Sequence, residues 1–418
     1  MTPSATQCAV PGCTHPVDDT APTVSVIMPT YNLARFIGHA IRSVLGQTCQ
    51  HFELIIVDDG STDDTRSVVA PFAERVRYHY RSNGGVAAAR NTGLAMAKGA
   101  FVTLLDADDL YEPDFLRTML ATFGAHPEAG AVYCGYRHVD EENRPLPQVE
   151  NRVVPPAQFR DTIARGSFMV PISVMVRRAC YDRMGQFDAN VGFLVDWDMW
   201  LRMSQHYRFV GISSVLARYR IVSTSMYTDL SNLLRSRLLV LEKHFGPCER
   251  PGQPASVRRA YAYAYLAAAV DHLQANHPEL AYEHLAECVT TCAAVLAEPE
   301  VFYELGCGPQ PRGCHGDFES IDFKRSTAWV EASLERLFTD RRVGQRLESY
   351  RRAAYGNAHA ALGRLNYGAR RMSQARRHLL RAVRANPALA LDRQLLSTAV
   401  RSLLWPVAAK LRGGTTAG

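Results

Sequence analysis

No stretch of this 418-residue sequence approaches the roughly 20 uninterrupted apolar residues that a membrane-spanning helix requires. The first 21 residues are rich in Pro, Thr and Asp and lack the basic-then-apolar pattern of a secretory signal. We therefore expect a cytoplasmic protein. The ten cysteines are scattered, which argues against a disulfide framework. Two Cys/His groups, within 8–15 and 307–315, contain no C-x-x-C pair, so zinc ligation there is a minor alternative.

Hydrophobic periodicity divides the chain into parts of different character. Strands are expected at 24–28, where Pro29 should stop the strand, and at 54–57, 76–80, 101–105 and 131–136, with helices at 33–46, 65–72 and 86–97. This alternation predicts an α/β fold, in which helices flank a mostly parallel sheet. We expect residues 1–22 to be a flexible tail and residues 23–230 to be a catalytic domain.

Residues 231–418 have a helical pattern, because strand signals disappear and Ala, Leu and Arg recur at helical spacing. An all-α domain is predicted there. Small and apolar residues in it fall at positions that resemble a tetratricopeptide unit: Leu362, Gly363, Ala375, Leu379, Ala382 and Pro387, with His359 where Trp is usual. One such unit cannot form a solenoid alone, and a plain helix bundle is an equal alternative.

Charge is distributed unevenly along the chain. Residues 341–418 hold 15 Arg and one Lys against two acidic residues, a net charge of +14; since the whole chain carries +6, residues 1–340 carry −8. Such a tail suggests an anionic partner, although solvated helix faces rich in Arg are an equal explanation. Residues 395–411 combine apolar side chains with Arg401, Lys410 and Trp405, so the protein could be peripheral at the inner face of an anionic membrane. A terminal helix docked on the helical domain is the favoured alternative.

Two acidic clusters each follow a short apolar run that is typical of a buried strand. Asp58 and Asp59 follow residues 54–57, and Asp106, Asp108 and Asp109 follow residues 101–105. Carboxylates that meet at the carboxyl ends of parallel strands can line a crevice for a nucleotide and a divalent metal. The sequence therefore indicates an enzyme with a nucleotide-linked substrate.

Five motifs in order give the chain from about 24 to 225 a resemblance to glycosyltransferase family 2. They are VIMPTYN at 26–32, VDDGSTD at 57–63, NGG at 83–85 with ARN at 89–91, LDADD at 105–109, and DWDMWLR at 196–202. The resemblance implies a GT-A-type fold and an inverting transfer of a sugar from a nucleotide-diphosphate sugar to an acceptor hydroxyl, in polysaccharide or glycoconjugate synthesis. The acceptor could be a saccharide, a lipid-linked sugar or a protein side chain.

The resemblance also assigns residues to the donor. It implies that Pro29, Tyr31, Asp59, Arg90 and Asp106 contact the nucleotide sugar. A nucleotide base needs a fixed acceptor, which Asp59 can supply at a strand end, and the ring of Tyr31 offers a face for stacking. Turn formation is the alternative role of Asp58 and Asp59. The pair Gly84-Gly85 before a helix could direct backbone N–H groups at anionic oxygens, or could form only a tight turn.

The D-x-D segment suggests a Mn²⁺ or Mg²⁺ site. Asp106 and Asp108 are two residues apart, so on an extended segment their side chains project the same way. Hard divalent cations bind carboxylate and phosphate oxygens together. By resemblance, Asp108 is the direct ligand, and Asp106 reaches the metal through water or contacts the ribose. For Asp109, capping of the following segment is an alternative.

Inversion requires one general base, and the resemblance assigns this role to Asp196. Asp198 is the second candidate, although a first-turn acid favoured by the helix dipole is preferred for it. Two residues depart from the family pattern: Val195 replaces a usual Glu, and Val222 replaces a usual His. Arg220, Ser223 and Ser225 could partly replace that His at the phosphates, and the loop 187–193 should border the acceptor site.

Two other functions compete with this prediction. A nucleotide-sugar-binding scaffold without catalysis would be consistent with Val195 and Val222, but not with the retention of four aspartates. A nucleotidyltransferase would need a Gly-rich basic loop after the first strand, where the chain has Pro29 and Tyr31 instead. No nucleic-acid partner is expected.

Overall fold

The computed structural model describes residues 21–222, 228–340 and 343–413, with side chains to residue 403. Contacts within the chain divide it into two units, 1–244 and 245–418. The helix α8 (Leu230–Phe245) reaches this boundary, and its Lys243 and His244 bond to Asp188 and Asp198. The predicted domain boundary at 230 stays a prediction. No helix among the described residues combines the length and the apolar character needed to cross a membrane.

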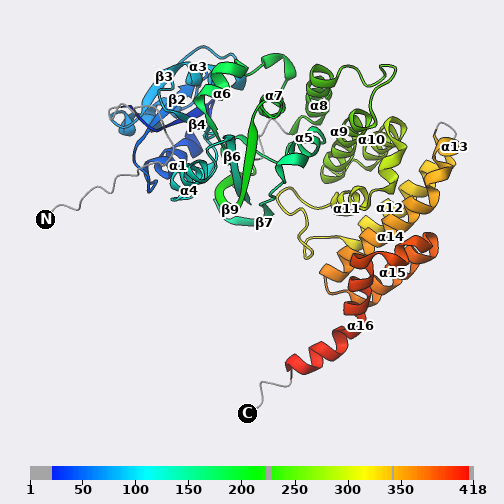
Figure 1. Cartoon of the computed structure of the whole chain (residues 1–418). Helices are drawn as coiled ribbons and strands as arrows, with labels where there is room; N and C mark the ends of the chain where they lie inside the picture. Colours follow the sequence, from blue (N-terminus) through cyan, green and yellow to red (C-terminus); the bar gives the residue numbers. More distant parts are fainter. Residues whose placement is uncertain (1–20, 223–227, 341–342, 414–418) are drawn as a thin grey trace. The chain divides into compact units, whose positions relative to one another are not determined.

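The first unit is built on one mixed sheet flanked by helices (Figure 1). Its strand order is β3-β2-β1-β4-β8-β6-β9-β5, with β7 paired to β6. Its strands are β1 Val24–Thr30, β2 Phe52–Asp58, β3 Arg77–Tyr80, β4 Phe101–Leu104, β5 Leu110–Tyr111, β6 Ala129–Val139, β7 Pro145–Glu150, β8 Val174–Arg177 and β9 Arg208–Arg220. The predicted α/β class is confirmed. Pairing is parallel from β3 to β4 and between β6 and β9, whereas β8, β7 and β5 pair antiparallel with their neighbours.

Helices cover both faces of the parallel part of the sheet. The helices of this unit before α8 are α1 Ala34–Leu45, α2 Thr65–Val69, α3 Val86–Met96, α4 Phe115–Ala125, α5 Pro156–Ala164, α6 Arg178–Met184 and α7 Val195–Met203. Val26 and Met28 of β1 share a core with Ile37 of α1. Ile27 points the other way and meets Gly93 of α3, where an added Cβ would lie 2.2 Å from its side chain. The absence of a side chain at Gly93 therefore sets how closely α3 packs on the sheet.

The second unit consists of helices. They are α9 Ala255–Gln274, α10 Pro278–Thr291, α11 Pro299–Cys307, α12 Phe323–Thr339, α13 Gly344–Leu347, α14 Arg351–Gly368, α15 Met372–Ala385 and α16 Arg393–Gly413. The prediction of a helical region is confirmed. Helices α14 and α15 pack closely where Gly363 meets Leu379, whose Cδ2 would lie 2.8 Å from an added Cβ. The tetratricopeptide assignment of this pair stays a prediction.

Candidate functional site

Adjacent strand ends in the first unit meet at a cavity of about 440 Å³. This cavity is lined by all seven residues that the sequence predicted to bind the donor or the metal or to act as the base: Pro29, Tyr31, Asp59, Arg90, Asp106, Asp108 and Asp196. The sheet order explains this convergence, because β2 and β4 flank β1 in parallel. The segments that follow β2 and β4 therefore emerge on either side of the end of β1, at the carboxyl edge where open α/β sheets bind ligands.

Asp59 is held as a fixed acceptor at this edge. Its carboxylate accepts hydrogen bonds from Arg81 Nη1 at 2.6 Å and from the backbone N–H groups of Gly84 and Gly85 at 3.1 and 2.7 Å. These glycine N–H groups thus bond to Asp59, and their contact with anionic oxygens of a ligand stays a prediction. Its neighbour Asp58 forms a turn, since it accepts from Ser61 N at 2.8 Å.

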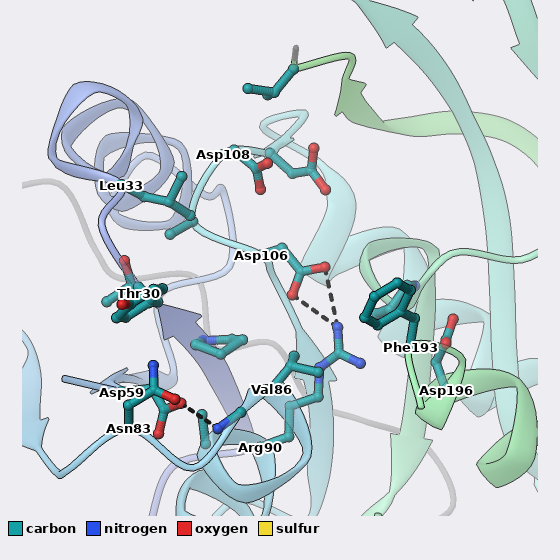
Figure 2. Close-up of a pocket in the computed structure, with 18 of the residues that line it drawn as sticks. Thr30, Leu33, Asp59, Asn83, Val86, Arg90, Asp106, Asp108, Phe193 and Asp196 are labelled. Carbon is teal, nitrogen blue, oxygen red and sulfur yellow. Dashed lines mark hydrogen bonds and ion pairs between the residues drawn. The ribbon is translucent and has the colours of Figure 1, made fainter. Parts of the chain in front are cut away.

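Arg90 joins the donor side of the cavity to the acidic cluster. Its Nη2 donates to Asp106 Oδ1 at 3.0 Å and Oδ2 at 3.2 Å (Figure 2). The side chain of Arg90 is 5% exposed and that of Asp106 is 27% exposed, so the pair is partly desolvated. In the view of Figure 2, Asp59 and Asp196 lie on opposite sides of the guanidinium.

The acidic cluster concentrates negative charge in a partly buried region, where Asp109 is buried and Asp106 and Asp108 are partly exposed. Burial, followed by the charge of Asp106, raises the pKa of Asp108 to about 6. Burial and the neighbouring Asp108 and Asp106 carboxylates raise the pKa of Asp109 well above its usual range. Such shifts mean that a cation near these oxygens would be stabilising. Asp109 does not cap a helix; its Oδ1 accepts from Arg220 N at 2.7 Å.

The side chain of Arg220 bonds to backbone carbonyls in and near the acidic cluster. Its Nε donates to the carbonyl of Asp108 at 2.6 Å, and its Nη1 donates to the carbonyls of Asp140 and Glu141 at 3.0 and 2.8 Å. Its side chain thus bonds to backbone carbonyls of two loops and is not among the residues that line the cavity, and its contact with phosphates stays a prediction. The other two residues of that expectation, Ser223 and Ser225, lie outside the described residues.

Asp196 and Asp198 lie in the first turn of α7, in different surroundings. Asp196 lines the cavity, and burial raises its pKa. Asp198 instead accepts from Lys243 at 2.9 Å, His244 at 3.0 Å and Arg202 at 3.0 Å. Burial alone would raise the pKa of Asp198, but the hydrogen bonds from His244 and Lys243 and nearby positive charges outweigh burial and lower it. The structural role preferred for Asp198 therefore agrees with its contacts.

The two departures from the family pattern occupy different environments. Val195 is fully buried in the first turn of α7. Val222 lines the cavity, so an apolar side chain stands at that wall. Phe193, from the loop expected to border the acceptor site, also lines the cavity.

Sequence reasoning missed Thr30 as a site residue. The residue lines the cavity, and its Oγ1 is buried with no hydrogen-bond partner among the described residues. Buried hydroxyl groups normally have a partner, so the hydrogen bonding of this oxygen is unsatisfied among the described residues. Its place directly between Pro29 and Tyr31 was the only local signal.

A family model and curated relatives match the first unit. The glycosyl transferase family 2 model matches residues 25–185. The putative teichuronic acid biosynthesis glycosyltransferase TuaG of Bacillus subtilis is 32% identical over 214 residues, which cover 50% of this chain and 82% of that protein. The chain belongs to glycosyl transferase family 2. It thus carries a glycosyltransferase domain, as the five motifs predicted.

Other curated relatives are matched over only part of their length. An uncharacterized glycosyltransferase of Rickettsia typhi is 28% identical over 218 residues, which cover 50% of this chain and 65% of that protein. Among solved structures, S. aureus TarS 1–349 in complex with UDP-GlcNAc has a TM-score of 0.44 and 18% identity, and the match covers 83% of this chain and 92% of that one.

Proposed function

We propose that this chain is an inverting, metal-assisted glycosyltransferase that moves a sugar from a nucleotide-diphosphate sugar to an acceptor hydroxyl. One observation carries the proposal: Asp59, Arg90, Asp106, Asp108 and Asp196 all line a single cavity of about 440 Å³. A cavity of this size is within the range that holds a small-molecule ligand.

The donor end of the proposed complex lies between β1 and β2. The ring of Tyr31, 48% exposed, offers a stacking face for the base. Asp59 is already oriented by Arg81 and two backbone N–H groups, so it can accept from a base or ribose without losing conformational freedom on binding. Thr30 Oγ1 supplies a further polar contact.

The acidic cluster fits a Mg²⁺ or Mn²⁺ ion. Carboxylate oxygens are the ligands that hard divalent cations prefer, and the raised pKa values of Asp108 and Asp109 reflect close, buried negative charge. Asp108 would hold the ion, with Asp106 nearby and fixed by Arg90. When bound, the ion offsets the negative charge that develops on the departing diphosphate.

Asp196 is the proposed general base. Its carboxylate takes the proton of the acceptor hydroxyl while that oxygen forms a bond to the anomeric carbon of the donor sugar. The bond from the same carbon to the diphosphate oxygen breaks, and its electron pair leaves with the nucleoside diphosphate. Attack opposite the leaving group inverts the anomeric configuration. The raised pKa of Asp196 makes it a stronger base than an exposed aspartate.

Relatives support a saccharide acceptor as the finer proposal. The B. subtilis relative is named for teichuronic acid biosynthesis, and a chondroitin synthase of Escherichia coli is 30% identical over 197 residues. Both names refer to polysaccharides. We infer that the hydroxyl that enters the cavity beside Phe193 and Asp196 belongs to a growing saccharide.

Nucleoside diphosphate release tests this function. Full-length protein is incubated with single UDP- and GDP-sugars, Mn²⁺ and an oligosaccharide panel, and released diphosphate and the linkage formed are measured. Wild type should transfer from one donor class, Asp108→Asn should lose both donor binding and transfer, and Asp196→Asn should bind the donor but not transfer. Donor binding by wild type without transfer or hydrolysis for every acceptor would favour the scaffold alternative instead.

A second proposal concerns the membrane. Helix α16 buries Leu395 and Ser402, as the docked-helix alternative expects, but Leu396, Val400 and Leu403 on another face are 44%, 51% and 61% exposed. The spacing of these three residues places them on one side of the helix. We infer that this face, helped by the net positive charge of residues 341–418, contacts an anionic membrane that carries lipid-linked acceptors.

Vesicle flotation tests the membrane contact. Wild type should float with vesicles that contain anionic lipid at low salt and dissociate at high salt. The double variant Leu396→Gln/Leu403→Gln should float less while its donor hydrolysis is unchanged. Equal flotation of wild type and variant, or none by either, would exclude this face as a membrane contact.

A further inference from the structure

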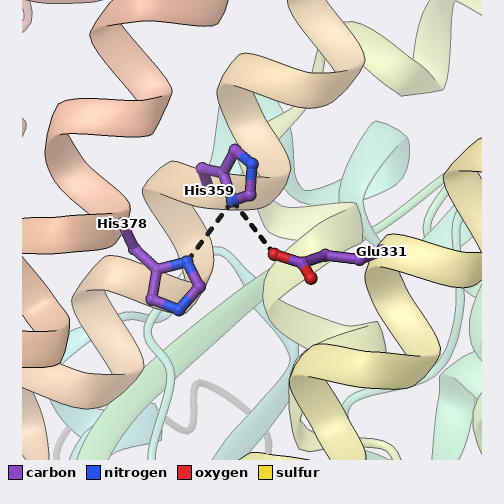
Figure 3. A group of neighbouring side chains, drawn as sticks. All are labelled: Glu331, His359 and His378. Atoms are coloured by element: carbon purple, nitrogen blue, oxygen red, sulfur yellow. Dashed lines mark hydrogen bonds and ion pairs between the residues drawn. The ribbon is translucent and has the colours of Figure 1, made fainter.

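Three metal-ligating side chains from three helices of the second unit meet at one point. Glu331 of α12, His359 of α14 and His378 of α15 direct their polar atoms toward one another (Figure 3). The two Nδ1 atoms of the histidines lie 3.3 Å apart, and His359 Nδ1 lies 3.9 Å from Glu331 Oε1. One ligand atom from each residue falls within 4.8 Å of the other two. The motifs of the catalytic domain do not account for this cluster.

The spacing of the two imidazoles matches tetrahedral coordination. Zinc binds histidine nitrogen at about 2.0–2.1 Å, so two nitrogens on one tetrahedral ion are separated by about 3.3 Å. The Nδ1 atoms of His359 and His378 already have this separation. Glu331, whose side chain is 42% exposed, has the freedom to move its carboxylate closer.

Burial favours the two histidines as ligands. The side chain of His359 is 13% exposed and His378 is 5% exposed, and both imidazoles face the same point from neighbouring helices.

We propose that Glu331, His359 and His378 form a binding site for a divalent transition-metal ion of the zinc type. Water would complete a four-coordinate shell, since three protein ligands leave one position open. The ion would cross-link α12, α14 and α15 and so stabilise the second unit. Imidazole ligands favour zinc-type ions, whereas the carboxylates of Asp106 and Asp108 suit Mg²⁺ or Mn²⁺, so the two sites differ in ion preference.

Arg381 opposes the proposed ion. Its Nη1 lies 3.0 Å from Glu331 Oε1. The guanidinium therefore competes with a metal ion for the same carboxylate. Glu331 has a second oxygen, so both can be bound, but the positive charge weakens metal affinity. Removal of this charge should therefore tighten binding. If the two histidines only form a hydrogen bond with each other, substitution of Arg381 should not change the affinity of the protein for zinc.

Zinc titration of the full-length, chelator-treated protein tests the site, with Zn²⁺ measured by calorimetry and elemental analysis. Glu331→Gln should weaken one class of site at least about tenfold, and His378→Ala should remove it. Arg381→Gln should bind more tightly than wild type. Glu335→Gln is the matched control, because this exposed residue lies one turn along α12 and loses the same charge. Circular dichroism verifies that each variant keeps its helices.

Cobalt spectroscopy separates this site from other zinc sites. Co²⁺ bound by wild type should give the visible absorption of a tetrahedral complex, and Glu331→Gln should reduce it while Glu335→Gln does not. If His378→Ala fails to fold, Glu331→Gln and Arg381→Gln still decide the outcome. Equal zinc affinity and stoichiometry in wild type, Glu331→Gln and Arg381→Gln would overturn the proposal.

Discussion

Arg90 and Asp106 form an ion pair in which one guanidinium nitrogen, Nη2, lies 3.0 and 3.2 Å from the two carboxylate oxygens. The resemblance had assigned both residues to the donor separately. Their pairing indicates that Arg90 orients Asp106 and balances part of the negative charge that Asp106 shares with Asp108. The position of the D-x-D segment thus depends on a buried arginine from α3.

Substitution of Arg90 should lower catalytic activity, and the loss should be larger than any accompanying loss of fold stability would cause. Arg90→Gln should lower kcat/KM by roughly 10–100-fold, because a charge-assisted hydrogen bond contributes about 1.5–3 kcal/mol. Steady-state assays at several Mn²⁺ concentrations measure this, and the concentration of Mn²⁺ needed for half-maximal rate should rise. Arg117→Gln, which removes an exposed ion pair with Asp114, is the control and should leave both values unchanged. Wild-type kinetics for Arg90→Gln would contradict the pairing role.

Asp196→Asn should stop transfer and stabilise the protein at neutral pH. Burial raises the pKa of Asp196, so the folded state favours its neutral form, and its stabilising contribution at low pH is lost as pH rises through the folded pKa. A neutral amide avoids that loss. Thermal unfolding should show a higher Tm for Asp196→Asn at pH 7, with the difference shrinking toward pH 4. A Tm at pH 7 that is lower for Asp196→Asn than for wild type would contradict the raised pKa of Asp196.

The pH profile of the wild type should reflect the same raised pKa. The acidic limb of kcat/KM should have its midpoint above the ordinary aspartate pKa of about 3.9, because a protonated Asp196 cannot accept the acceptor proton. Initial rates at saturating Mn²⁺ across pH 4–8 measure it, together with a Tm at each pH to exclude unfolding. An acidic limb at or below the ordinary value would indicate another base.

Asp198→Asn should have the opposite effect on stability. Its pKa is lowered by its cationic partners, so Asp198 contributes stability above its unfolded pKa that is lost as pH falls through the folded value. Removal of one member of a buried ionic cluster costs about 3 kcal/mol or more. Chemical denaturation at pH 7 should show this loss, whereas donor binding by the folded variant should persist. An unchanged free energy of unfolding would contradict the role of Lys243 and His244.

Thr30→Val tests the buried hydroxyl at the cavity wall. Because Thr30 Oγ1 has no partner among the described residues, its removal should not destabilise the protein without ligand. If the donor forms a hydrogen bond with Thr30 Oγ1, the dissociation constant of the donor from Thr30→Val should be about 3–10-fold higher than from wild type. This change corresponds to a bond of about 0.5–1.5 kcal/mol. Calorimetric titration with nucleoside diphosphate measures the change. Unaltered affinity would remove Thr30 from the donor site.

Local pattern predicted the parallel part of the fold well. The expected strands, helices and acidic strand ends between 24 and 105 are present, with boundaries that differ by a few residues. The first strand continues through Pro29 to Thr30, although Pro29 was expected to stop it. Beyond Ile27, the pairing of β1 with β4 ends and only the pairing with β2 continues, so the proline lies at a position with one paired side, where its missing N–H is tolerated.

Long-range contacts explain what local pattern could not predict. The pairing of β6 with β8 and β9 joins segments up to about 80 residues apart, and no local signal specifies the partner. Likewise, the bond between Arg81 and Asp59 arises only because β2 and β3 are neighbours. Spacing placed His359 in a helix, but its meeting with Glu331 depends on helix packing.

Crystallography with a nucleoside diphosphate and Mn²⁺ tests the central claim most directly. Anomalous scattering at the manganese edge should give a peak beside the carboxylate of Asp108, with the diphosphate in contact with the ion and the base near Tyr31 and Asp59. The same experiment on Asp108→Asn should lose the peak. A nucleotide bound elsewhere on the chain, or manganese away from Asp106 and Asp108, would contradict the account.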